Sequence, residues 1–218
     1  MDNWDVRPIA PADTSALVTR CWPDDPAAAR RLFSAQATIG MAAWDGATCV
    51  GMLHCYAVDL PSLDSADWPT WNQWWSSVVG FDAPLSGRAW CHACFHVGRI
   101  VAQARIDDDP DASYFGRGIA TALCRASVGW AKENGYAHVF GPGAPSALPA
   151  FSVWAGSLPW TTYAKLGFRE VASLGSRDEL PGWARGESPP HVMAQARDAL
   201  AEGRSPADFV TRLMQFDL

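Results

Sequence analysis

The clearest hydrophobic pattern in this chain is a helical stripe between residues 118 and 134. Apolar residues recur there at the spacing of helical turns: Ile119, Leu123, Ala126 and Trp130. Because such positions share one face, the stripe predicts an amphipathic helix with Gly135 as its stop. Further helices are predicted over residues 27–35, 146–156, 160–166 and 191–202, with another beginning near residue 14.

Runs rich in apolar and β-branched residues predict the strands. The Asp45-Gly46 pair is a strong turn signal, so residues 37–44 and 48–58 are expected to form a hairpin. Residues 89–97 are apolar on both faces, as in a buried central strand, with 99–106 as the alternative. The remaining strands are expected at 4–9, 136–140, 168–174 and 210–218, with Gly141-Pro142-Gly143 ending the strand at 136–140. This order of elements predicts an α+β fold.

Two stretches look longer than a minimal fold of this kind needs, at residues 59–87 and 175–207. We interpret them as insertions within a single domain that spans residues 1–218. In the first, a tryptophan face (Trp68, Trp71 and Trp75) is expected either to wall an acceptor pocket or to cover the sheet.

Composition and charge exclude some classes of partner. The net charge is −6, which argues against nucleic acid and against an anionic membrane as partners. No apolar run reaches the length of a membrane span, and the first residues lack the pattern of a signal peptide. The six cysteines are expected to be reduced thiols, so we expect a cytoplasmic protein.

Chemistry is suggested first by the sequence Gly116-Arg117-Gly118-Ile119-Ala120-Thr121. Two glycines before a helix bare several backbone N–H groups at its positive end, where an anion such as a pyrophosphate can bind. The dinucleotide fingerprint fails, because its third glycine would fall at Thr121, and the P-loop pattern is missing. The alternative is a glycine turn that merely starts a helix.

The segment from Tyr114 to Leu123 resembles the acetyl-CoA loop of the GNAT superfamily of N-acetyltransferases. Gly118 and Ala120 match the family pattern, whereas Phe115 stands where Gln or Arg is expected. The later segment Tyr163-Ala164-Lys165-Leu166-Gly167-Phe168 is similar to the family's Tyr-x-x-x-Gly-Phe motif. The family often has Asn seven residues before that tyrosine, where this chain has Gly156.

The resemblance implies a mostly antiparallel sheet with a splayed central strand and helices on both faces. It also implies direct transfer of an acetyl group from acetyl-CoA to the amine of a small molecule or peptide. Tyr163 would protonate the departing thiolate. The residues expected to bind the cofactor are Val97, Gly98, Gly116, Arg117, Gly118, Ile119, Ala120 and Thr121. The alternatives are an acyl-CoA-binding module without turnover and a transferase for another acyl chain; a homodimer is left open.

The strand predicted at 89–97 offers the candidates for the base that removes a proton from the acceptor amine. Strand alternation predicts that Trp90, His92, Cys94 and His96 share one face, with His96 or His92 as the base. Cys91 and Cys94 would lie on opposite faces, and His92 and His96 would be about 13 Å apart, so no metal is expected. A Cys94 acyl-enzyme is chemically possible, but the resemblance favours direct transfer.

Overall fold

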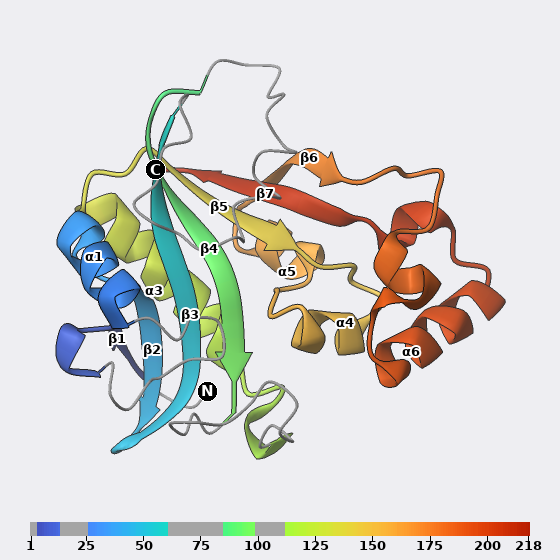
Figure 1. Cartoon of the computed structure of the whole chain (residues 1–218), viewed down its shortest axis with the longest axis horizontal. Helices are drawn as coiled ribbons and strands as arrows, with labels where there is room; N and C mark the ends of the chain where they lie inside the picture. Colours follow the sequence, from blue (N-terminus) through green and yellow to red (C-terminus); the bar gives the residue numbers. More distant parts are fainter. Residues whose placement is uncertain (1–3, 14–25, 61–84, 99–111) are drawn as a thin grey trace. The chain divides into compact units, whose positions relative to one another are not determined.

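The structure is a computed structural model that describes residues 4–13, 26–60, 85–98 and 112–218 (Figure 1). These residues form two compact units. The first contains the described residues up to Val139 together with Leu218, and the second contains Phe140–Asp217. Four interpretations lie outside the described residues: the helix near residue 14, the tryptophan face, most of the first insertion, and the alternative strand at 99–106.

The sheet of the first unit has the strand order β1-β2-β3-β4. Its strands are β1 (Asp5–Pro8), β2 (Gly40–Asp45), β3 (Thr48–Leu60) and β4 (Gly87–Val97). All three pairings between neighbours are antiparallel. Asp45 pairs with Thr48 across the turn, where Gly46 has a φ of 58°, a value that glycine adopts readily. The predicted Asp-Gly hairpin is therefore confirmed.

Helix α3 (Ile119–Glu133) contacts all four of these strands (Figure 1). Its buried residues are Ile119, Leu123, Cys124, Ser127 and Ala131. The predicted helix is confirmed, but the buried stripe is turned slightly, because Ala126 and Trp130 are only half-buried. Trp130 instead packs against Trp90 and Tyr136, with ring centroids 4.6 and 5.7 Å away.

Helix α1 (Pro26–Gln36) ends beside β3. The side chain of its last residue, Gln36, bonds to the backbone of β3 as a neighbouring strand would. Gln36 Oε1 accepts a hydrogen bond from the Ala57 amide at 2.9 Å, and Gln36 Nε2 donates to the Cys55 carbonyl at 3.0 Å. Gln36 is buried, and Nε2 also donates to the Thr38 carbonyl at 2.9 Å. A side-chain amide thus continues the pairing of β3 beyond the start of β2. The next residue, Ala37, has a left-handed φ of 67°.

The strand order of the second unit is β5-β7-β6, and β6 and β7 are antiparallel. Its elements are β5 (His138–Gly143, which begins in the first unit), α4 (Pro149–Trp154), α5 (Trp160–Lys165), β6 (Arg169–Leu174), α6 (Pro190–Ala201) and β7 (Thr211–Asp217). Phe151, Val192 and Phe209 are buried in one apolar cluster between α4, α6 and the turn before β7. The helix predicted inside the second insertion is α6.

The prediction that Gly141-Pro142-Gly143 ends a strand is wrong, because these residues belong to β5. Their glycines serve close packing. A Cβ at Gly141 would lie 2.2 Å from Tyr163 Oη, and one at Gly143 would lie 2.7 Å from Trp160 Cβ. The pairings β1–β2, β2–β3, β3–β4 and β6–β7 confirm the α+β fold with mostly antiparallel strands. The single domain and the splayed strand stay predictions.

Candidate functional site

The start of α3 is an uncapped helix N-terminus framed by two glycines. Gly116 and Gly118 have φ values of 72° and 81°, in the left-handed region, and both are exposed. Gly118 is the N-cap residue, and no side chain caps the helix. The Ala122 amide donates to the Gly118 carbonyl at 3.0 Å, so the amides of residues 119–121 precede the helical hydrogen-bond ladder. The predicted glycine turn before the helix is present, and its role as an anion site stays a prediction.

A glycine in β3 sets where this helix begins. A Cβ at Gly51 would lie 2.4 Å from Ile119 Cγ2 and 3.3 Å from Leu123 Cδ1. Only a residue without a side chain lets the first turn of α3 lie this close to the sheet. Ile119 is consequently buried, while Ala120 and Thr121 remain half-buried.

The Arg117 side chain packs against two aromatic rings, those of Trp4 and Tyr114. Its guanidinium carbon is 4.7 Å from the Trp4 ring centroid and 5.3 Å from that of Tyr114. These contacts hold a positive charge on the glycine loop itself, where it would favour an anion. The neighbouring Phe115 is 37% exposed, so the residue that departs from the family pattern points to the surface rather than into the core.

A β-bulge divides the histidines of β4. His54 pairs with Cys94, but the next residue of β3, Cys55, pairs with His92, which leaves Ala93 as an extra residue in β4. The predictions that His92 and Cys94 share one face and that Cys91 and Cys94 lie on opposite faces are therefore wrong, because the extra residue reverses the alternation. Trp90 and His92 face α3, whereas Cys94 and His96 face the other side.

On the α3 side, Ser127 is a buried hydrogen-bond centre. Its hydroxyl accepts from Trp90 Nε1 at 2.9 Å and lies 3.1 Å from His92 Nε2 and 3.6 Å from Cys55 Sγ. Burial lowers the pKa of His92 to about 3, so the ring is neutral in the folded protein. His92 is therefore a residue of the core, and of the two predicted bases His96 remains the candidate.

On the opposite face, a thiol and an imidazole meet. Cys94 Sγ lies 3.2 Å from His96 Nε2, and the His54 and His96 ring centroids are 5.8 Å apart. Cys94 is 5% exposed and His96 is half-buried. Among the described residues, no group of three or more His, Cys, Asp or Glu side chains is arranged to hold a metal ion.

The two residues assigned to the thioester edge differ in what their amides do. The Gly98 amide donates to the Val50 carbonyl at 3.0 Å, so it is engaged by β3. Val97 pairs with Gly51, the next position along the ladder. Because amides alternate in direction along an antiparallel strand, the Val97 N–H points away from β3. Of the two residues, Val97 is the better candidate to donate a hydrogen bond to a thioester oxygen.

Tyr163 belongs to the second unit and is fully buried. Its ring packs edge-on against Phe168 at 4.8 Å between centroids, and its hydroxyl end lies over the backbone of Gly141. The phenol is thus held against β5, and its predicted role as an acid stays a prediction. Gly156, which replaces the family's Asn, is buried with a φ of 59°.

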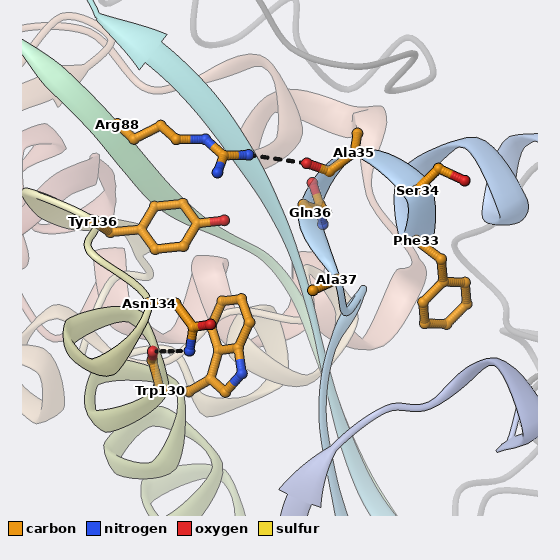
Figure 2. A pocket seen from close by; sticks show the side chains of 9 residues that line it. All are labelled: Phe33, Ser34, Ala35, Gln36, Ala37, Arg88, Trp130, Asn134 and Tyr136. Atoms are coloured by element: carbon orange, nitrogen blue, oxygen red, sulfur yellow. Dashed lines mark hydrogen bonds between the residues drawn. The ribbon is translucent and has the colours of Figure 1, made fainter.

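A pocket of about 270 Å³ opens at the other end of α3, beside the end of α1 (Figure 2). Arg88 reaches across it and donates to the Ala35 carbonyl at 3.1 Å, while its guanidinium carbon lies 5.1 Å from the Tyr136 ring centroid. Burial raises the pKa of Tyr136 to about 12. With 15 residues in α3, the pocket is about 22 Å from the glycine loop and separate from it.

Sequence reasoning missed the bulge at Ala93 and the role of Ser127. Neither has a signal in a single strand or helix, because both depend on which residues of β3 and α3 meet β4. The close contact at Gly141 did have a signal, since two glycines in an otherwise buried strand indicate close approach of another chain segment.

Comparisons with known proteins support the fold. No family model and no curated protein gives a match to the sequence. Among solved structures, a mosquito arylalkylamine N-acetyltransferase-like protein (5b) matches with a TM-score of 0.53 and 12% identity, covering 99% of this chain and 100% of its own. A proposed arylalkylamine N-acetyltransferase 7 from the yellow fever mosquito matches with a TM-score of 0.50 and 15% identity, covering 88% of this chain and 68% of its own.

At these identities the likeness establishes the fold. The chain has the fold of the GNAT N-acetyltransferases, which is what the glycine loop and the Tyr163 segment predicted. No helix among the described residues is both long and apolar enough to cross a bilayer.

Proposed function

We propose that this protein is an N-acetyltransferase that moves the acetyl group of acetyl-CoA to the amine of a small molecule or peptide. The observation that carries the proposal is the uncapped N-terminus of α3, framed by Gly116 and Gly118, within a GNAT fold. Exposed amides at a helix N-terminus suit the pyrophosphate of coenzyme A. The structural neighbours are named as arylalkylamine N-acetyltransferases, which agrees with this reaction.

The residues proposed to bind acetyl-CoA all belong to the first unit. The amides from Gly116 to Thr121 would contact the pyrophosphate, and Arg117 would add a positive charge. Thr121, in the first turn of α3, would contribute its hydroxyl. The Val97 N–H would hold the thioester oxygen, which gains negative charge as the carbonyl is attacked.

Two proton transfers complete the reaction. The acceptor amine must lose a proton to act as a nucleophile, and His96 is the proposed base. The coenzyme A thiolate must gain one, and the Tyr163 phenol is the proposed donor. The resemblance to the GNAT superfamily implies direct transfer between the two substrates. A homodimer and a cytoplasmic location stay predictions.

The binding experiment uses a charge at the start of α3. Thr121→Asp places a carboxylate in the first helical turn, where it interacts favourably with the helix dipole and keeps the fold stable. A pyrophosphate about 5 Å away would be repelled by about 3 kcal/mol at an effective dielectric constant of about 20, which is a loss of affinity of more than about 100-fold. Calorimetric titration with coenzyme A measures it, with Thr121→Asn as the uncharged control of similar size.

Equal affinity of Thr121→Asp and Thr121→Asn for coenzyme A would contradict the proposed site. A second measurement separates an enzyme from a binding module of the same fold, the alternative suggested by Phe115 and Gly156. Acetyl-CoA is incubated with a panel of arylalkylamines, polyamines and peptide N-termini, and acetylated products are detected by mass spectrometry. Tight binding without any product favours the module.

A further inference from the structure

The bulge in β4 directs a nucleophile and a base to the face away from α3. Because Ala93 is the extra residue, Cys94 and His96 both point away from α3, two positions apart on the same face. Cys94 Sγ and His96 Nε2 are 3.2 Å apart, which is within hydrogen-bond distance for sulfur. Bulges often occur next to active sites, where they change the direction of a side chain.

Among the cysteines that the structure describes, Cys94 differs in what surrounds its thiol. Burial raises the pKa of Cys49 to about 11 and that of Cys124 to about 12, and it also raises the pKa values of Cys55 and Cys91. Thiols of this kind are inert. Among the five cysteines within the described ranges, Cys94 is the one with an imidazole at hydrogen-bond distance. A thiol paired with an imidazole is the usual arrangement of a nucleophilic cysteine.

We propose that Cys94 is a catalytic nucleophile with His96 as its base, and that the acetyl group passes through a Cys94 thioester before it reaches the amine. This inference rests on the proposed function and changes its route from one transfer to two. It also gives His96 a defined first task, since the Nε2 atom already faces the thiol whose proton it would remove.

Both steps balance without a further reactant. In the first, His96 takes the Cys94 proton, the Cys94 sulfur attacks the acetyl carbon, and the bond from that carbon to the coenzyme A sulfur breaks. The proton held by His96 passes to the leaving sulfur, so coenzyme A leaves as a thiol and His96 is neutral again. In the second, the amine attacks the acetyl carbon of Cys94, the carbon–sulfur bond breaks, and the proton lost by the amine restores the thiol. The first step exchanges one thioester for another, so little free energy is needed to reach the intermediate.

The test begins with the unaltered protein and acetyl-CoA, without an amine. The proposal predicts one equivalent of released coenzyme A and a protein heavier by one acetyl group, located by peptide mass spectrometry at Cys94. Hydroxylamine should remove the group, because it cleaves thioesters, and an acceptor amine should remove it while forming acetylated product. Acetylated amine formed in a single turnover with no acetyl group on Cys94 at any time would overturn the proposal and leave the proposed function standing.

Two variants sharpen the result. Cys94→Ala should lose the adduct and at least about 100-fold in transfer rate, whereas the matched Cys91→Ala, on the same strand and face, should keep both. His96→Gln should slow adduct formation by a similar factor and flatten its pH profile, because the base is gone. Normal turnover of Cys94→Ala contradicts the covalent route. Absence of both coenzyme A binding and product from the unaltered protein contradicts the proposed function as well.

Discussion

Ser127→Ala should destabilise the first unit strongly, because one hydroxyl serves two buried nitrogens. Ser127 Oγ accepts from Trp90 Nε1 at 2.9 Å and lies 3.1 Å from His92 Nε2, and all three residues are 0% exposed. The substitution removes the acceptor of the buried indole N–H and the hydroxyl that His92 Nε2 contacts. The loss of a buried hydrogen-bond partner costs about 1–3 kcal/mol, so the two losses together should lower the free energy of unfolding by roughly 3 kcal/mol.

The chain offers a matched control in Ser152, whose buried hydroxyl has no hydrogen-bond partner. Ser152→Ala removes an unsatisfied polar atom, so its unfolding free energy should stay equal or rise slightly. Denaturant unfolding followed by tryptophan fluorescence measures both variants. Thermal unfolding should show a drop of about 6–12 °C for Ser127→Ala, at roughly 2–4 °C per kcal/mol. Equal shifts for the two variants would refute the assignment of Ser127 as a shared hydrogen-bond partner.

Three further results are expected. Burial lowers the pKa of His92 from 6.5 to about 3, so unfolded chains bind the proton first as the pH falls. The contribution of His92 to stability is full above about pH 6.5 and decreases by about 1.4 kcal/mol per pH unit down to about pH 3, a slope that His92→Gln should reduce in denaturant titrations at each pH. Ala37→Gly should stabilise by about 1 kcal/mol, because Ala37 has a φ of 67°, whereas Ala35→Gly inside α1 should destabilise by a similar amount in the same assay. Gly141→Ala places a methyl group 2.2 Å from Tyr163 Oη, so it should cost about 1–3 kcal/mol and lower turnover; unchanged values of both would contradict the close contact.

The sequence was most informative where a pattern is local. The stripe from Ile119 to Trp130 placed α3 within about a residue at each end, because Gly118 and Gly135 mark its limits. The Asp45-Gly46 pair placed the hairpin for the same reason. The helix expected over 146–156 is shorter, from Pro149 to Trp154, because Pro149 fits the first turn and the residues before it form a turn.

Features that depend on pairing between distant segments could not be predicted. A single extra residue in β4 has no local signature, yet it moves Cys94 and His96 to the face opposite His92. The two glycines of β5 were interpreted as the end of a strand, and the positions of Tyr163 beside Gly141 and of Trp160 beside Gly143 show why they occur within it. The candidate residues of the site were thus mostly found from motifs, while their grouping required the structure.

The side chain of Gln36 has a consequence for solubility. Beyond the start of β2, the Cys55 carbonyl and the Ala57 amide of β3 could otherwise pair with an extended peptide that approached this edge. Gln36 occupies the Cys55 carbonyl and the Ala57 amide at once, so another chain finds no template there. The Gln36 side chain thereby protects this edge of β3 against pairing with a second chain. We expect Gln36→Ala to aggregate more readily than the unaltered protein, even where it still folds.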